Sequence, residues 1–307
     1  MVYAVVSKTT SRKAVRVRLP PSAQLTEWST SMENLDSLQH AELERLEIYF
    51  RVEYLSNFFN LPLTIKERGR QSRIFFVSKD EMIKQAAEYE VALTQAIKNT
   101  SVDSTAETFI KEYLPDLHRE EFWERDIETT ISQDLKNADA IFIATANGQR
   151  SIYVDRNHTM SDFDKDFSLS HELLHSLSSE GFGGREGLKI VSRGGIFLDR
   201  LNEASTEILR EFARREWNVD APPNLSQIRD TLINENYQES AIFLMTSMML
   251  TSLPDGKPIT IRDLASYYFD INDKKGRNPI DFLSELTSSV PQQYIDRVTK
   301  LTLDRLF

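Results

Sequence analysis

Apolar residues recur every three or four positions along much of the chain, the spacing that places them on one face of an α-helix. The clearest stripe lies in the first third of the sequence and consists of Leu43, Leu46, Phe50, Tyr54 and Phe58. After it, Arg73–Val77 is predicted as a short apolar strand, and Asp80 is expected to cap a helix that runs to about Asn99. We therefore predict a mostly helical region over residues 21–137, and this region contains no catalytic motif.

Two pairs of segments have the composition of β-strands instead. Near the N-terminus, the β-branched run Val2–Val6 and the alternating run Ala14–Leu19 predict a β-hairpin. Further along the chain, Ala140–Thr145 and Ser151–Asp155 flank the dipeptide Asn147-Gly148, which is favoured in type I′ turns and predicts a second hairpin.

Helical periodicity resumes at about Phe167 and continues to the end of the chain. Clusters of glycine and proline are expected to interrupt it at Gly181–Gly195, Pro222-Pro223, Pro254–Gly256 and Lys274–Pro279. We therefore predict an α+β fold that is predominantly helical. Its regions are a basic β-hairpin over 1–20, a mainly helical region over 21–137 and a third region over 138–307 whose C-terminal part is helical.

The composition limits which kinds of site the protein can have. The 307 residues are 40% hydrophobic and 27% charged, which are ordinary values for a globular protein with a substantial core. The net charge of −10 argues against general nucleic-acid binding, because such binding relies on neutralising phosphates. The chain has no cysteine and five histidines, so disulfides and thiolate sites are excluded, and any metal must be bound by histidine or carboxylate side chains.

Positive charge is concentrated in the N-terminal hairpin, which has no acidic residue before Glu27. Its cations are Lys8, Arg12, Lys13, Arg16 and Arg18. Two interpretations stay open, a solvated edge strand protected by charge or an arm that docks an acidic partner such as nucleic acid.

The N-terminal residues lack the long apolar core and the small-residue cleavage site of a secretory signal. No apolar run reaches the roughly 18 residues needed to span a bilayer. We therefore expect a cytoplasmic protein that does not bind membranes.

The strongest chemical signal lies in Phe167–Gly184, which reads FSLSHELLHSLSSEGFGG. It contains an HExxH motif, His171–His175. Histidines at positions i and i+4 of a helix project from one face, so both imidazoles can bind a single zinc ion. Glu172, next to the first histidine, is placed to act as a general base on a zinc-activated water. Ser168 or Ser170 is expected to cap the start of this helix.

A second helix is predicted at Leu201–Leu209, which reads LNEASTEIL. Glu203 and Glu207 are four residues apart, so both side chains face the same way. No histidine follows His175, so a third ligand located after the motif must be a carboxylate. The order HExxH and then NExxx(D/E) resembles gluzincins, the zinc peptidases that include thermolysin-like enzymes.

That resemblance, which covers about Ala140–Leu250, implies a zincin-like catalytic region, one Zn²⁺ and hydrolysis of the peptide bonds of a peptide or protein substrate. It implies that Glu203 is the third zinc ligand. It also implies that Glu207 accepts the free ring N–H of a ligand histidine, His171, and fixes its tautomer.

Many zinc peptidases also use a strand before the motif helix to pair with the extended substrate backbone. By that resemblance we expect an edge strand formed by Ser151, Ile152, Tyr153 and Val154.

A peptidase of this kind needs a donor for the developing oxyanion. Tyr237 is our candidate, because it opens the segment YQESAIFLMTSMML after the ligand helix, although core packing is an alternative role for it. Weaker candidates are Tyr153, Arg193, Arg210 and Tyr267. The glycine-rich stretch Gly181–Gly195 is either a mobile loop over the cleft or a simple connector.

Three hypotheses about function follow from these motifs. The first is a cytoplasmic zinc-dependent peptidase. The second is a regulatory protease that resembles the ImmA/IrrE type, in which the helical N-terminal region recognises one specific partner. The third is a non-catalytic interaction protein with a structural zinc, and an intact Glu172 argues against it, because a structural site has no use for a base.

Overall fold

The structure is a computed structural model, and it divides the chain into two compact units, Met1–Leu43 and Glu44–Phe307. The residues that it describes are 3–6, 15–18, 32–98, 135, 138–157, 162–192, 195–197, 199–227, 238–251, 256–271 and 279–288.

The first unit contains the N-terminal hairpin. Strands β1 (Tyr3–Val6) and β2 (Val15–Arg18) pair antiparallel, which confirms the predicted hairpin. Helix α1 (Met32–Phe59) begins in this unit and continues into the second. A role for the hairpin in docking an acidic partner stays a prediction.

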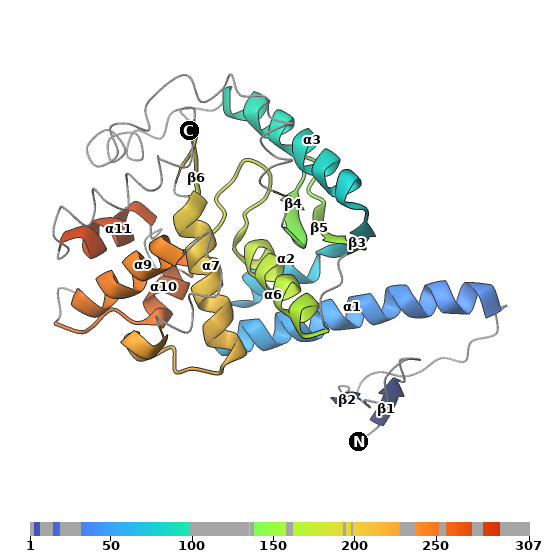
Figure 1. Cartoon of the computed structure of the whole chain (residues 1–307), viewed down its shortest axis with the longest axis horizontal. Helices are drawn as coiled ribbons and strands as arrows, with labels where there is room; N and C mark the ends of the chain where they lie inside the picture. Colours follow the sequence, from blue (N-terminus) through green and yellow to red (C-terminus); the bar gives the residue numbers. More distant parts are fainter. Residues whose placement is uncertain are drawn as a thin grey trace. The chain divides into compact units, whose positions relative to one another are not determined.

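The second unit contains a three-stranded mixed sheet with the order β3-β5-β4. Figure 1 shows this sheet between helices. Strand β3 (Arg73–Val77) runs parallel to β5 (Arg150–Asp155), and β4 (Ala140–Ala144) runs antiparallel to it. The predicted strand and the second predicted hairpin are therefore confirmed, and the sheet joins a strand of the helical N-terminal region to that hairpin.

The position of β5 in this sheet corrects one prediction. Because β5 pairs with β3 on one side and with β4 on the other, it has no free edge. The prediction that Ser151, Ile152, Tyr153 and Val154 form a substrate-binding edge strand is therefore wrong. The local pattern could not reveal this, because the second neighbour of β5 comes from a distant part of the chain.

The turn between β4 and β5 also differs from the prediction. The N–H of Gly148 donates to the carbonyl of Thr145 at 2.9 Å, and the N–H of Thr145 donates to the carbonyl of Gln149 at 2.9 Å. Gly148 has a φ of 82°, whereas Asn147 does not adopt a positive φ. This is a type I turn followed by a left-handed glycine, and not a type I′ turn, which needs two positive φ angles.

Helices cover both faces of the sheet. Ile152 of β5 packs in the core with leucines of α6 (Asp162–Ser178), whereas the hydroxyl of Tyr153 donates to Gln85 of α3 (Lys79–Lys98). Because neighbouring side chains of a strand point to opposite faces, α6 and α3 lie on opposite sides of the sheet. Helix α6 begins earlier than Phe167, so neither Ser168 nor Ser170 caps its start, contrary to the prediction.

Helix α2 (Leu63–Arg70) packs closely against α6. A Cβ atom added to Gly69 would lie 2.7 Å from Leu177 Cδ2 of α6 and 2.9 Å from Val52 Cγ2 of α1. Glycine therefore allows the close approach that holds α6 between α2 and the sheet.

The remaining helices build the other side of the core. Helix α7 (Asp199–Arg214) packs against α6, α9 (Gln238–Leu250) and α10 (Ile261–Tyr268), and α11 (Pro279–Ser288) packs against α9 and α10. The protein is thus a mostly helical α+β structure with a small mixed sheet. Within the described part of the chain, no helix is both long enough and apolar enough to cross a membrane.

Candidate metal centre

Helix α6 is buried around its whole circumference in its second half. Its three leucines at 173, 174 and 177 have no exposed surface, and His171 and His175 are only 8% and 4% exposed. Burying a polar imidazole is costly unless it finds polar partners. The polar groups around these two histidines therefore determine whether the imidazoles can bind a ligand.

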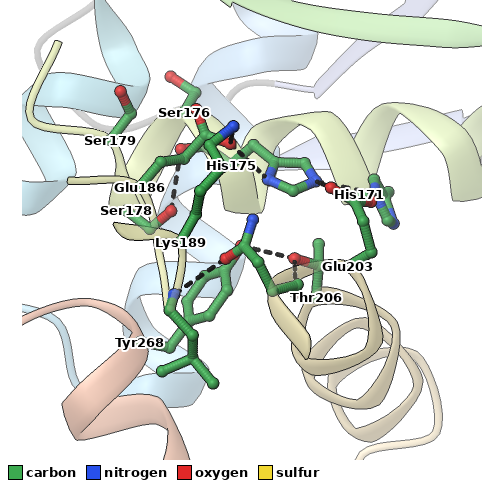
Figure 2. Close-up of polar contacts among 12 residues, drawn as sticks. His171, His175, Ser176, Ser178, Ser179, Glu186, Lys189, Glu203, Thr206 and Tyr268 are labelled. Carbon is green, nitrogen blue, oxygen red and sulfur yellow. Dashed lines mark hydrogen bonds and ion pairs between the residues drawn. The ribbon is translucent and has the colours of Figure 1, made fainter. Parts of the chain in front are cut away.

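The two imidazoles and one carboxylate meet at a single point (Figure 2). The Nε2 atoms of His171 and His175 lie 2.9 Å apart. Glu203 of α7 places Oε2 at 3.0 Å from Nε2 of His171 and Oε1 at 3.3 Å from Nε2 of His175. All three ligand atoms lie within 4.8 Å of one another, so His171, His175 and Glu203 form a buried group that could hold a metal ion.

A second carboxylate stands behind each imidazole. Glu207 Oε1 lies 3.1 Å from Nδ1 of His171, and Glu186 Oε1 lies 3.2 Å from Nδ1 of His175. A carboxylate at Nδ1 favours the tautomer that has its proton there, which leaves the Nε2 lone pair free for a metal. Both histidines thus present Nε2 to the same point.

Each of these outer carboxylates is in turn paired with a cation three residues later in the sequence. Lys189 Nζ lies 3.1 Å from Glu186 Oε1, and the guanidinium of Arg210 contacts Glu207. Burial alone would raise the pKa of Glu186, but Lys189 and His175 lower it to about 2. Glu186 is therefore a carboxylate anion at every physiological pH.

The donor set fits a divalent cation. Two Nε2 lone pairs and a carboxylate facing one another at about 3 Å repel unless a positive charge lies between them. Burial would lower the pKa of His171, yet Glu203 and Glu207 raise it to about 9, and burial would raise the pKa of Glu203, yet the two histidines lower it well below its usual range. The group therefore attracts positive charge, and two imidazoles with one carboxylate are a ligand set typical of catalytic zinc.

Glu172 lies on α6 between the two histidines in sequence and is buried. Burial raises the pKa of its carboxyl, and the neighbouring histidines oppose this rise. Burial lowers the pKa of Arg210 to about 10, and the negative charge of Glu172 is one of those that oppose this shift. Arg210 in turn contacts Glu207. Glu172 therefore belongs to the same buried network as the triad.

The structure adds Glu186, which the sequence analysis did not predict, to the residues around the two histidines. It lies in the glycine-rich connection after α6, between Gly184 and Gly187. No periodicity applies there, so its distance to His175 could not be derived from spacing. Proximity to the motif and the scarcity of acids in this stretch were the only signals.

Of the other predicted oxyanion donors, Arg210 contacts Glu207, whereas Tyr153 and Tyr267 make hydrogen bonds with other partners. The hydroxyl of Tyr153 donates to Gln85 on the α3 face of the sheet, and the hydroxyl of Tyr267 donates to Glu285 at 3.3 Å. Tyr237 and Arg193 lie outside the described residues. The identity of an oxyanion donor therefore stays a prediction.

Comparisons with known proteins assign no family to this chain. No protein-family model, no curated protein and no solved structure matches it. The interpretation of the centre rests on the chemistry of its own residues.

Proposed function

We propose that this protein is a zinc-dependent peptidase of gluzincin type. The observation that supports the proposal most directly is the convergence of His171, His175 and Glu203 in a buried group, together with a glutamate next to the first histidine. Bound zinc would polarise the substrate carbonyl and lower the pKa of the attacking water.

The protein's own residues would divide the remaining work. Glu172 takes a proton from the attacking water and delivers it to the departing amine, so that it serves as base and then as acid. Glu207 holds His171 in the tautomer that binds metal. The buried surroundings keep the charges of these groups strong, because bulk water does not screen them.

The number of ligands favours a catalytic role over a structural one. Structural zinc sites are closed by four protein ligands, whereas catalytic sites use three and leave a position for water or substrate. Within the part of the chain that the structure describes, the group has three members. A buried Glu172 is also of no use to a purely structural site.

The first experiment is Glu172→Gln, measured for zinc content and for cleavage of a panel of peptides and unfolded proteins. We expect zinc content to stay near that of the wild type and cleavage to fall by at least about 100-fold, because general-base catalysis contributes about 10²–10⁴-fold. Glu180→Gln is the matched control, because Glu180 is exposed just beyond α6.

Two results would contradict the proposal. One is a wild-type protein that binds no zinc, and the other is full cleavage by Glu172→Gln. The panel also tests the regulatory alternative, because a protease dedicated to one partner would leave generic unfolded substrates intact.

A further inference from the structure

The connection between α6 and β6 (Ile190–Ser192) approaches the candidate metal centre closely. Glu186 in this connection is 9% exposed, and its carboxylate lies between Nδ1 of His175 and the ammonium of Lys189. Figure 2 shows Glu186 and Lys189 beside His175. A buried carboxylate in such a position has a cost of desolvation that these two partners offset.

The backbone around Glu186 is fixed from several sides. Arg185 Nε donates to the carbonyl of Gly187 at 3.0 Å, and the N–H of Leu188 donates to Oδ1 of Asn202 at 2.9 Å. Gly187 has a φ of 56°, a left-handed conformation that favours glycine. The carboxylate of Glu186 is thus held by a rigid turn, and not by a freely moving loop.

Asn202 connects this turn to the ligand helix. It is fully buried on α7 and immediately precedes Glu203, the carboxylate of the triad. One helix therefore provides the carboxylate ligand and also, through its neighbouring amide, the anchor for the turn that bears Glu186. A shift of α7 would therefore move both Glu203 and the anchor of this turn.

We propose that Glu186 is a positioning residue for His175, and that it does for this ligand what Glu207 does for His171. The proposal rests on the proposed zinc site and names a part of it that lies outside the HExxH and NExxx(D/E) motifs. In this role Glu186 keeps the proton of His175 on Nδ1, aims Nε2 at the metal and increases its basicity.

The test compares Glu186→Gln with two glutamine variants of other glutamates. Glu207→Gln is the positive control, and Glu180→Gln, which changes an exposed acid of the same connection, is the negative control. Zinc affinity is measured by competition with a chromophoric chelator. We expect Glu186→Gln and Glu207→Gln each to bind zinc about 10–100-fold more weakly than the wild type, and Glu180→Gln to bind it equally well. Glu186→Asp, which keeps the charge, should recover part of the affinity.

A second readout does not depend on any variant folding. In the zinc-loaded wild type, ¹⁵N-labelled imidazoles observed by NMR should show His175 protonated at Nδ1 and bound to metal through Nε2. The ¹⁵N shift of Nδ1 should also show that its N–H donates to a strong acceptor, which a structural role for Glu186 alone would not require. Cobalt(II) in place of zinc gives a third readout, since its visible absorption should shift between the wild type and Glu186→Gln.

The inference is overturned if Glu186→Gln binds zinc as tightly as the wild type, or if His175 binds metal through Nδ1. These outcomes differ from a failure of the proposed function. If the wild type binds zinc but cleaves nothing, the proposed peptidase activity is wrong, whereas the proposed role of Glu186 is unaffected. A wild type that binds no zinc would remove both.

Discussion

At the scale of single residues, the centre contains two similar series of paired charged groups. In one, Arg210 pairs with Glu207, which faces His171. In the other, Lys189 pairs with Glu186, which faces His175. Each cation pairs with a buried carboxylate, and each carboxylate lies beside Nδ1 of an imidazole. The two imidazoles then share one carboxylate, Glu203, at the place where a metal would bind.

Glu203→Ala tests the ligand assignment at this scale. Removing a direct ligand should weaken zinc binding by more than the about 10–100-fold expected for an outer carboxylate, because two imidazoles alone hold zinc poorly. The measurement is zinc per chain by elemental analysis after dialysis. Unchanged zinc content would remove Glu203 from the site.

At the scale of secondary-structure elements, α6, α7 and the turn after α6 must keep fixed positions relative to one another. The i and i+4 spacing on α6 aligns the two histidines, and α7 brings Glu203 and Glu207 to them. The turn at Gly187 is wedged between Asn202 of α7 and the ring of Tyr268 of α10. The hydroxyl of Tyr268 is itself 2.7 Å from Thr206 of α7, so these elements form one packed unit.

Gly187→Ala tests this packing. The added Cβ would lie 2.5 Å from Cε2 of Tyr268 and would also collide with Asn202, and the left-handed backbone adds strain. We expect the free energy of unfolding to fall by about 2–5 kcal/mol, the sum of overpacking and of a left-handed non-glycine residue. Urea denaturation of the metal-free protein measures this loss.

Gly148→Ala is the control for that experiment. Gly148 also has a positive φ, but a Cβ added there would meet nothing within 4 Å. Its cost should be limited to about 1–2 kcal/mol of backbone strain. An equal loss at both positions would show that strain alone, and not contact with α7 and α10, determines the stability of the turn.

At the scale of the whole molecule, the site lies in the main core of the second unit. Leucines of α6 pack in the same cluster as residues of α7, α9 and α10. Four glutamates meet around the two histidines, at positions 172, 186, 203 and 207, whereas Lys189 and Arg210 provide two cations. The acidic groups therefore outnumber the two cations around the histidines, which favours a bound metal cation.

Metal binding should therefore stabilise the entire second unit. At free zinc of 100 times the dissociation constant, the gain is about 2.7 kcal/mol, which corresponds to a rise of several degrees in the melting temperature. Calorimetry with zinc or with a chelator measures the difference. Glu203→Ala should show a much smaller difference, and an equally large one would place the stabilising metal elsewhere.

Local sequence patterns were sufficient for the parts of the site that lie on helices. Helical geometry converts a spacing of four residues into a shared face, so His171 could be paired with His175, and Glu203 with Glu207, without coordinates. The role of Glu203 as a third ligand came from the resemblance to gluzincins. Apolar strand composition located the strand at Arg73–Val77, and the Asn147-Gly148 dipeptide between two such segments located the second hairpin. These features depend on interactions between residues close in sequence.

Only the tertiary structure could decide what depends on distant contacts. It placed β5 in the centre of the sheet, because β3 pairs with it from far along the chain. It also brought Glu186 to His175, because Asn202 and Tyr268 hold a turn whose sequence has no period. The sequence alone thus predicted the two helices of the candidate metal centre and the three residues that meet there, whereas packing between elements placed Glu186 beside His175 and decided which strands lie at the edges of the sheet.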